Sequence, residues 1–303
     1  MFPDTELLQV HYKKAYRNMK NRNLKINNSN LMKKHNIIPV LLLFFCFNLF
    51  PVLHAQEKFT VIKVSGNIVI VRTGSPLDIG TAFEQDEDLL FKSTASRAAV
   101  INPQRGRYLL TSDNLDEFRN STSGFLPPSE KISARGAGII MNVNDLKNYF
   151  EGDYVILDQI KITLNPDIFP MNDKKYFYIR YSYKNEIINK KLAFRGDTLI
   201  INKNELFTID GKLISNPEIT EMKLMYMEEG LNYVSTPICA FTPVFPEYVQ
   251  LKKEVQIILD QMKSKDYKDK LLEISAFIND FYGKPDEGNL KEWLLLNFNL
   301  KEK

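Results

Sequence analysis

The sequence predicts a mainly β protein that ends in an α-helical segment: two small antiparallel sandwich- or barrel-like β modules, then two or three helices. Three observations support this class. Short β-branched and aromatic runs alternate with glycine, proline and asparagine turns between residues 58 and 245, as in small β sandwiches and barrels. A linker-like stretch divides these runs at residues 113–150. After Pro246, apolar residues recur at helical spacing.

An apolar run from Ile37 to Leu53 precedes the modules and has the features of a secretory signal. Residues 32–35 supply a positive start, residues 38–50 form a hydrophobic stretch, and Ala55 is a small residue at a cleavage position. We therefore predict a signal peptide at residues 32–55 and a mature chain that begins at Gln56, exported to the periplasm or the extracellular space.

The alternative is that residues 37–53 stay uncleaved as a single-pass inner-membrane anchor. The run is slightly shorter than the roughly 20 apolar residues that span a bilayer, and Asn48 and Pro51 interrupt it. Membrane contact is expected only in this case. Residues 1–31 are rich in Lys, Arg and Asn, so we predict either a disordered extension or an upstream mis-start before Met32.

The basic charge of the chain is concentrated in its leader. Residues 1–55 hold 8 of the 40 Lys and Arg residues but 2 of the 37 Asp and Glu residues. The remainder therefore carries 32 basic and 35 acidic residues, a net charge near −3 instead of the +3 of the whole chain. Because no basic footprint is left on the body, no nucleic-acid partner is predicted.

The body also lacks histidine, since His11, His35 and His54 all lie in the leader. This removes the commonest metal ligand and the usual general base for a Ser or Cys nucleophile. No catalytic, cofactor-binding or metal-binding residue is therefore assigned. An enzyme is disfavoured, although catalysis by carboxylates, Lys or Tyr stays open. Cys239, the one cysteine of the body, is interpreted as a small core residue.

The first module, residues 56–112, is predicted from five short apolar runs that are separated by turn residues. The runs cover residues 59–64, 68–71, 89–91, 96–101 and 107–110. The acidic stretch from Glu84 to Asp88 is interpreted as a solvated loop, with weak Ca²⁺ binding as the less favoured alternative, because the spacing of an EF-hand is absent.

The turn and core positions of residues 58–112 resemble a known family. They are Gly66, Val69, Val71, Leu77, Gly80, Leu89, Leu90, Ser96, Ala98, Val100, Gly106, Tyr108 and Leu110. Their order resembles the periplasmic β domain of FecR-type regulators, in which a glycine hairpin, a Leu-x-x-Gly turn and a Ser-x-Ala strand follow one another. The resemblance implies a small β fold and a membrane-anchored regulator whose cytoplasmic region holds a sigma factor. Residues 1–36 are short and unpatterned for such a region, and the rest of the chain is similar only to bacterial exported proteins in general.

The connector, residues 113–150, contains Ser, Gly and Pro clusters and one predicted short helix at residues 143–150. The second module, residues 151–245, is again predicted from strand-like runs and hairpins. The runs cover residues 154–157, 160–164, 176–183, 190–194, 198–201, 206–209, 212–214, 222–227 and 233–235.

One strand of the second module holds a candidate binding row. Because side chains alternate along a strand, Tyr176, Tyr178 and Arg180 share one face, while Phe177, Ile179 and Tyr181 face the core. The row is either a platform on which a sugar stacks or part of ordinary aromatic packing, and packing is favoured.

The helical segment, residues 246–303, carries apolar stripes that must be buried. We expect its helices to pack on each other and on the second module. The alternative is a partner-binding surface anchored by Trp293, since large exposed stripes are unusual on monomers.

Together these features favour an exported, non-catalytic binding or scaffold protein of a bacterial envelope, with a protein or an envelope glycan as partner. Two alternatives remain: a membrane-anchored FecR-type regulator, and a hydrolase that uses two carboxylates on a β scaffold.

Overall fold

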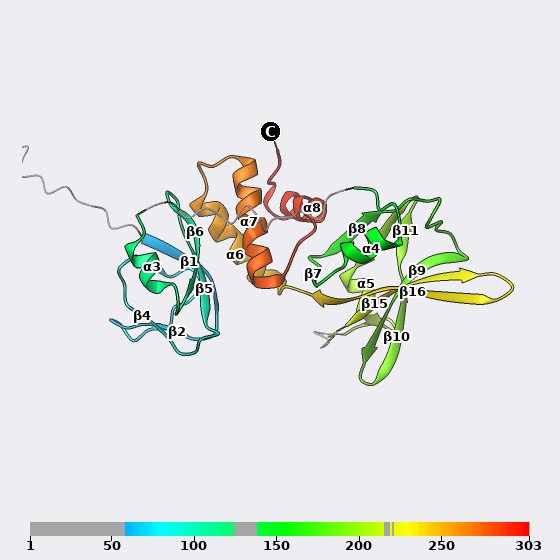
Figure 1. The fold of residues 1–303 in the computed structure, drawn as a ribbon, viewed down its shortest axis with the longest axis horizontal. Coiled ribbons are helices and arrows are strands. Elements are labelled where there is room, and N and C mark those ends of the chain that lie inside the picture. The colour runs from blue at the N-terminus through cyan, green and yellow to red at the C-terminus, as the bar shows by residue number, and fades with distance from the viewer. Residues whose placement is uncertain (1–57, 123, 125–137, 215–218, 220, 303) are drawn as a thin grey trace, which may run out of the picture. The chain divides into compact units, whose positions relative to one another are not determined.

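The predicted fold class is confirmed: the chain is mainly β, with a group of helices at its C-terminal end (Figure 1). The computed structural model describes residues 58–122, 124, 138–214, 219 and 221–302. These belong to the compact unit Glu57–Lys303. The predicted extension and signal peptide lie outside the described residues.

The first module is built on a four-stranded antiparallel sheet with the order β3-β1-β5-β6, and a separate pair joins β2 to β4. The strands are β1 (Lys58–Ser65), β2 (Ile68–Ile70), β3 (Ala82–Glu84), β4 (Leu89–Phe91), β5 (Arg97–Asn102) and β6 (Gly106–Thr111). The short strand β3 was not predicted.

Strand β5 is buried on both faces. Ala98 and Val100 face a core shared with β2, β4 and helix α3 (Leu115–Asn120), whereas Ala99 and Ile101 face a core shared with the C-terminal helices. A strand that is covered on both sides is expected to be apolar throughout instead of alternating. This explains the continuous run in residues 98–101.

Two positions of the FecR-like pattern have a direct physical reason. Gly66 adopts a φ of +82°, and a Cβ built there would lie 2.5 Å from the Ser96 Oγ. That hydroxyl also accepts a hydrogen bond from the Asn67 amide at 3.2 Å. The β1–β2 turn therefore requires glycine and a small hydroxyl residue beside it.

Helix α3 extends the first module into the segment that the sequence assigns to the connector. Phe118 of α3 is fully buried, and its ring meets that of Phe59 edge-on at 4.8 Å. Gln85 and Arg105 donate hydrogen bonds to the Ser121 carbonyl just after α3, at 2.9 and 2.7 Å. The single aromatic residue that anchors this helix has no periodic pattern around it.

The second module contains a five-stranded sheet with the order β10-β9-β15-β16-β7 and a three-stranded sheet with the order β11-β12-β8. The strands are β7 (Asp153–Val155), β8 (Gln159–Thr163), β9 (Lys175–Tyr183), β10 (Glu186–Lys191), β11 (Ala193–Arg195), β12 (Thr198–Asn202), β15 (Met222–Glu229) and β16 (Tyr233–Val244), with a small pair of β13 (Thr208–Ile209) and β14 (Lys212–Leu213). Phe177, Leu199 and Leu224 contribute to one core from both larger sheets.

Two details of this module differ from the prediction. The β7–β16 pair is parallel, while the other strand pairs among the described residues are antiparallel. Strand β16 continues to Val244 through Pro237 and Pro243, where the sequence predicted an end at Ser235. Proline is tolerated in a strand where one side of its backbone is unpaired. Between residues 142 and 207 the short helices α4 (Val143–Tyr149) and α5 (Lys203–Leu206) complete the module, and α4 was predicted.

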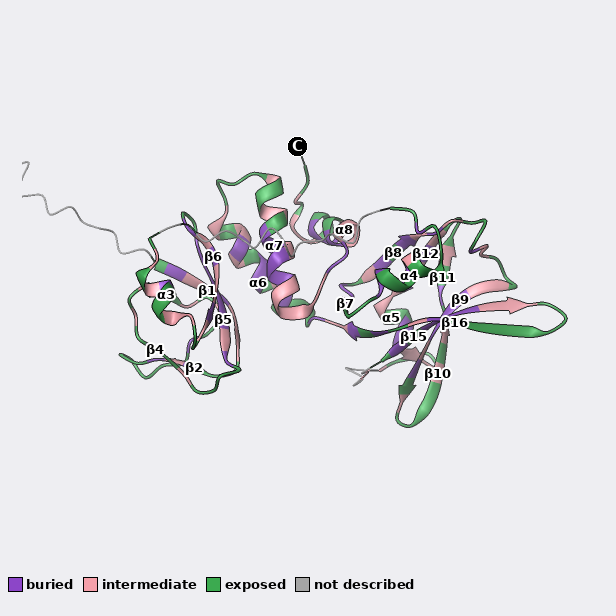
Figure 2. Cartoon of the chain, viewed as in Figure 1, coloured by how far each residue is buried: buried purple, intermediate pink, exposed green. Residues whose placement is uncertain are grey.

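The C-terminal helices are α6 (Tyr248–Gln261), α7 (Tyr267–Tyr282) and α8 (Glu287–Phe298). Carboxylates of Glu247, Asp266 and Asp286 cap their N-termini. The buried faces of α6 and α7 (Figure 2) share a core with Ile62 of β1 and with Leu157 after β7. The helices therefore pack on both β modules, not on the second alone.

Candidate binding site

The predicted row on β9 lies on the outer face of the five-stranded sheet. Phe177, Ile179 and Tyr181 are buried in the core of the module, as the alternation predicted. Their neighbours Tyr176 and Arg180 are half-buried on the opposite face.

The two tyrosines of the row are already engaged. Tyr178 is only 5% exposed, and its hydroxyl lies 2.6 Å from the Ser235 Oγ. The Tyr176 hydroxyl donates to Glu229 at 2.9 Å, and the Lys191 Nζ lies 3.9 Å from the centre of its ring. These contacts favour packing over an open stacking platform.

Arg180 is the member of the row that borders a cavity, and its guanidinium is held in place. The Nε donates to the Asn189 Oδ1 at 2.9 Å, and the Nη2 donates to the Tyr178 hydroxyl at 3.2 Å. The planar fork of an arginine that is fixed in this way suits a carboxylate or phosphate.

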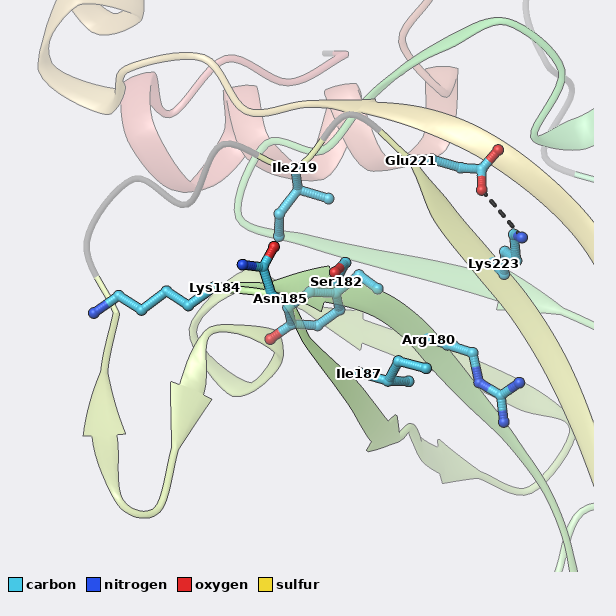
Figure 3. A pocket seen from close by; sticks show the side chains of 9 residues that line it. Arg180, Ser182, Lys184, Asn185, Ile187, Ile219, Glu221 and Lys223 are labelled. Carbon is cyan, nitrogen blue, oxygen red and sulfur yellow. Dashed lines mark ion pairs between the residues drawn. The ribbon is translucent and has the colours of Figure 1, made fainter.

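The cavity measures about 490 Å³ and lies where two strands part. Strand β9 pairs with β10 up to the Tyr183–Glu186 pair but with β15 only up to Arg180 and Lys223. The hairpin therefore extends beyond β15. Figure 3 shows the lining residues, with Lys184 at one end and Arg180 and Lys223 at the other.

Charge around this cavity is mainly positive. Arg180, Lys184 and Lys223 line it together with one carboxylate, Glu221. The Lys223 Nζ lies 3.3 Å from the Glu221 Oε1, and both side chains are more than half exposed. Such an exposed pair contributes at most about 1 kcal/mol. Sequence reasoning missed one signal for this site. Lys184 and Asn185 stand between the strands β9 and β10 and form the two-residue turn of a hairpin.

A second cavity, about 210 Å³, lies between the β5–β6 turn and helices α6 and α7. Its lining includes Asp269 and Glu273, which are one turn apart on α7. Burial raises the pKa of Glu273, while the adjacent Arg107 opposes that rise. Arg107 also contacts Asp280 at 2.7 Å.

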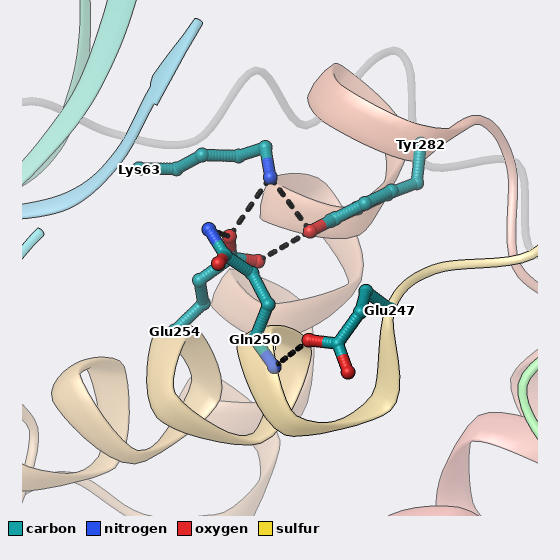
Figure 4. Close-up of polar contacts among 5 residues, drawn as sticks. All are labelled: Lys63, Glu247, Gln250, Glu254 and Tyr282. Atoms are coloured by element: carbon teal, nitrogen blue, oxygen red, sulfur yellow. Dashed lines mark hydrogen bonds and ion pairs between the residues drawn. The ribbon is translucent and has the colours of Figure 1, made fainter.

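A buried polar cluster joins β1 to two helices (Figure 4). The Lys63 Nζ contacts the Glu254 Oε1 at 2.8 Å and donates to the Tyr282 hydroxyl at 2.7 Å. That hydroxyl donates to the Glu254 Oε2 at 2.6 Å. Gln250 donates to the same carboxylate at 3.1 Å. Burial, together with the bond to Glu254, raises the pKa of Tyr282 well above its ordinary value.

No local pattern of the sequence indicates this cluster, because a glutamate on an amphipathic helix is expected on the solvent face. Glu254 is instead fully buried. Its cation, Lys63, lies 191 residues earlier in the chain, so no local pattern announces the pair.

Trp293 is not a surface anchor. It is 4% exposed, and its ring meets that of Phe298 at 5.6 Å. The alternative of an exposed Trp293 is therefore wrong, because the helix buries this face in the core shared with α6 and α7.

Cys239 is partly buried against the core of the second module. Burial raises the pKa of its thiol to about 11.

The acidic stretch of the first module is engaged by arginines. Arg72 contacts Glu87 at 2.8 Å, and Arg119 contacts Asp88 at 2.6 Å. In the part of the chain that the structure describes, no three His, Cys, Asp or Glu side chains gather as metal ligands.

Comparison with protein-family models, curated proteins and solved structures finds no match to this chain. Within the described ranges, the helices are too short or too polar to cross a membrane.

Proposed function

We propose that this chain is an exported, non-catalytic binding or scaffold protein of a bacterial envelope, which acts in the periplasm or outside the cell. Its partner is a protein or an envelope glycan. The observation that carries this proposal is the cavity of about 490 Å³ at the end of the five-stranded sheet, whose lining includes Arg180, Lys184 and Lys223 and one carboxylate, Glu221. This volume lies within the roughly 300–1,000 Å³ typical of ligand sites.

The contacts of the buried carboxylates support binding over catalysis. Glu254 is held by Lys63 and Tyr282, and Glu273 is held by Arg107. Asp286 caps helix α8 and accepts a hydrogen bond from Tyr149 at 2.9 Å. Carboxylates that are engaged in this way hold elements together and are not presented to a substrate in the larger cavity.

Cell fractionation with N-terminal sequencing tests the export part of the proposal. The expected product starts at Gln56 and is recovered from the periplasm or the medium. Recovery of the chain in the cytoplasm with residues 32–55 intact would contradict export.

The membrane-anchored FecR-type regulator is the first alternative. The close contact between Gly66 and Ser96 gives two positions of the resemblance a structural reason, which supports the family's β fold more than its regulatory role. An intact Met1 in the membrane fraction would favour this alternative, and cleavage after Ala55 would remove it.

A carboxylate-based hydrolase is the second alternative, and the smaller cavity favours it. Asp269 and Glu273 both line that cavity, and two carboxylates beside one space are the arrangement that acid–base hydrolysis of a glycan uses. Hydrolysis of envelope glycan by the purified chain, lost in Asp269→Asn with unfolding unchanged, would support this alternative. Equal hydrolysis by wild type and Asp269→Asn, or none by either, would dismiss it.

A further inference from the structure

The cavity beside β9 has the features of a site for an acidic peptide, and this inference rests on the proposed binding function. We propose that it takes an extended, carboxylate-rich segment of a partner protein. Three properties of the described residues carry the proposal: the charge of the rim, the backbone of β9, and the conformation of the β9–β10 turn.

Cations lie at both ends of the cavity, and polar uncharged groups lie between them. Figure 3 shows Lys184 at one end, Arg180 and Lys223 with the paired Glu221 at the other, and Ser182 and Asn185 in between. A linear molecule that bears several negative charges along its length matches this arrangement. The orientation of Arg180 by Tyr178 and Asn189 prepares one end for a carboxylate before binding.

The backbone of β9 favours a peptide over an acidic glycan. Tyr183 pairs with Glu186 across the two-residue turn, so its backbone groups face β10. By alternation, the N–H and C=O of Ser182 face the side of β15 and the cavity. The ladder between β9 and β15 ends at Arg180 and Lys223, one hydrogen-bonded pair short of Ser182. An extended peptide can form that pair, as in strand addition to a sheet edge.

The turn that carries Lys184 has a conformation that favours other residues. Lys184 has a φ of 50° and Asn185 a φ of 65°. Asparagine is common in this left-handed region, but lysine is not, and type I′ turns prefer Asn or Gly at both positions. A strained lysine on the rim of a cavity is consistent with a role in binding.

The test is a titration of the purified exported protein, free of its basic leader, into fluorescent hexa-glutamate, followed by anisotropy at low salt. Uncharged hexa-glutamine of the same length is the control probe. Arg180→Gln and Lys223→Gln should each weaken binding about tenfold, the value of one charged hydrogen bond. Lys253→Gln, at an exposed position on α6, makes the same charge change elsewhere and should leave the affinity unchanged. Thermal unfolding of each variant verifies that it folds.

Two further probes separate the other occupants. An alternately N-methylated hexa-glutamate keeps its carboxylates but loses backbone donors, so it should bind several-fold more weakly. Oligogalacturonate is a carboxylated glycan, and tighter binding of this probe than of the peptide would overturn the proposal. Equal affinity of Arg180→Gln and Lys253→Gln would also overturn it. A chain that is exported but binds none of the probes contradicts this inference and leaves the proposed function standing, whereas a chain that is not exported contradicts the proposed function.

Discussion

Lysine and glutamate form ion pairs in two regions of the molecule: on the outer face of the second module, and between the first module and the helices. The two regions differ in how far these pairs are buried. Lys63 and Glu254 are enclosed, with side-chain exposures of 15% and 0%. Lys223 and Glu221 are in contact but remain 51% and 56% exposed. An enclosed pair is difficult to replace, because either partner alone would be a buried charge. An exposed pair exchanges readily with a ligand.

Burial, not residue type, therefore decides whether a charge stabilises the fold or is available for binding.

Breaking the enclosed pair should be the most destabilising change. Glu254→Gln leaves Lys63 without its counter-charge, so the free energy of unfolding should fall by about 3 kcal/mol. Urea unfolding followed by circular dichroism measures this. Glu228→Gln is the matched control, because Glu228 contacts Lys175 in a pair that is 44% and 41% exposed, and it should cost less than about 1 kcal/mol. Similar losses for the two variants would remove the distinction between the regions.

Trp293→Ala should also lower the free energy of unfolding by about 3 kcal/mol, because it opens a cavity in the core of the helices.

Trp293 is the only tryptophan of the chain, so its fluorescence reports this region alone. Its emission should be that of a buried indole in the native protein, shift to the red on unfolding, and stay unchanged when hexa-glutamate binds. A shift of this emission on peptide binding would indicate that the partner binds the helices near Trp293.

Cys239 should resist alkylation in the native protein. Its pKa of about 11 lies above that of an ordinary thiol, so the reactive thiolate is scarce at pH 8 and increases only as the pH approaches 11. Labelling with iodoacetamide, read by mass spectrometry of the peptide that contains Cys239, should be slow at pH 8 and rapid in urea. Equal rates in both conditions would show that this part of the second module is open.

The smallest effect is expected at the strained turn. Lys184→Gly relieves the positive φ but adds freedom to the unfolded chain, so the net gain should be about 0.5 kcal/mol. The same variant should bind hexa-glutamate more weakly, because it loses a cation of the cavity. Greater stability together with weaker binding would sharpen the assignment of this turn to function. Unchanged binding would assign Lys184 to the turn alone.

Local sequence patterns predicted the elements in which buried residues recur at one regular spacing. The alternation of residues 176–183 predicted the core face of β9, since only one side of that strand meets the core. The same logic failed for β16, because its prolines occupy a strand that is unpaired along part of one side.

Partners that are distant in the sequence explain the rest. Glu254 is charged, and only the fold reveals that Lys63 reaches it. The cavity is present because β15 separates from β9 beyond the Arg180–Lys223 pair. The local pattern of neither strand predicts where the two separate. The alternation placed Tyr178 on the same outer face as Arg180 but could not predict that Tyr178 is buried there. Its burial depends on a contact with Ser235 of β16, which is distant in the sequence.

The most direct test of this account measures unfolding and peptide binding on the same preparations of Arg180→Gln and Glu254→Gln. Arg180→Gln should weaken hexa-glutamate binding about tenfold with nearly unchanged unfolding. Glu254→Gln, kept below its unfolding transition, should bind as tightly as wild type while losing about 3 kcal/mol of stability. The opposite pattern, or the same change in both quantities for both variants, would contradict the separation between enclosed charges that hold the fold and exposed charges that bind.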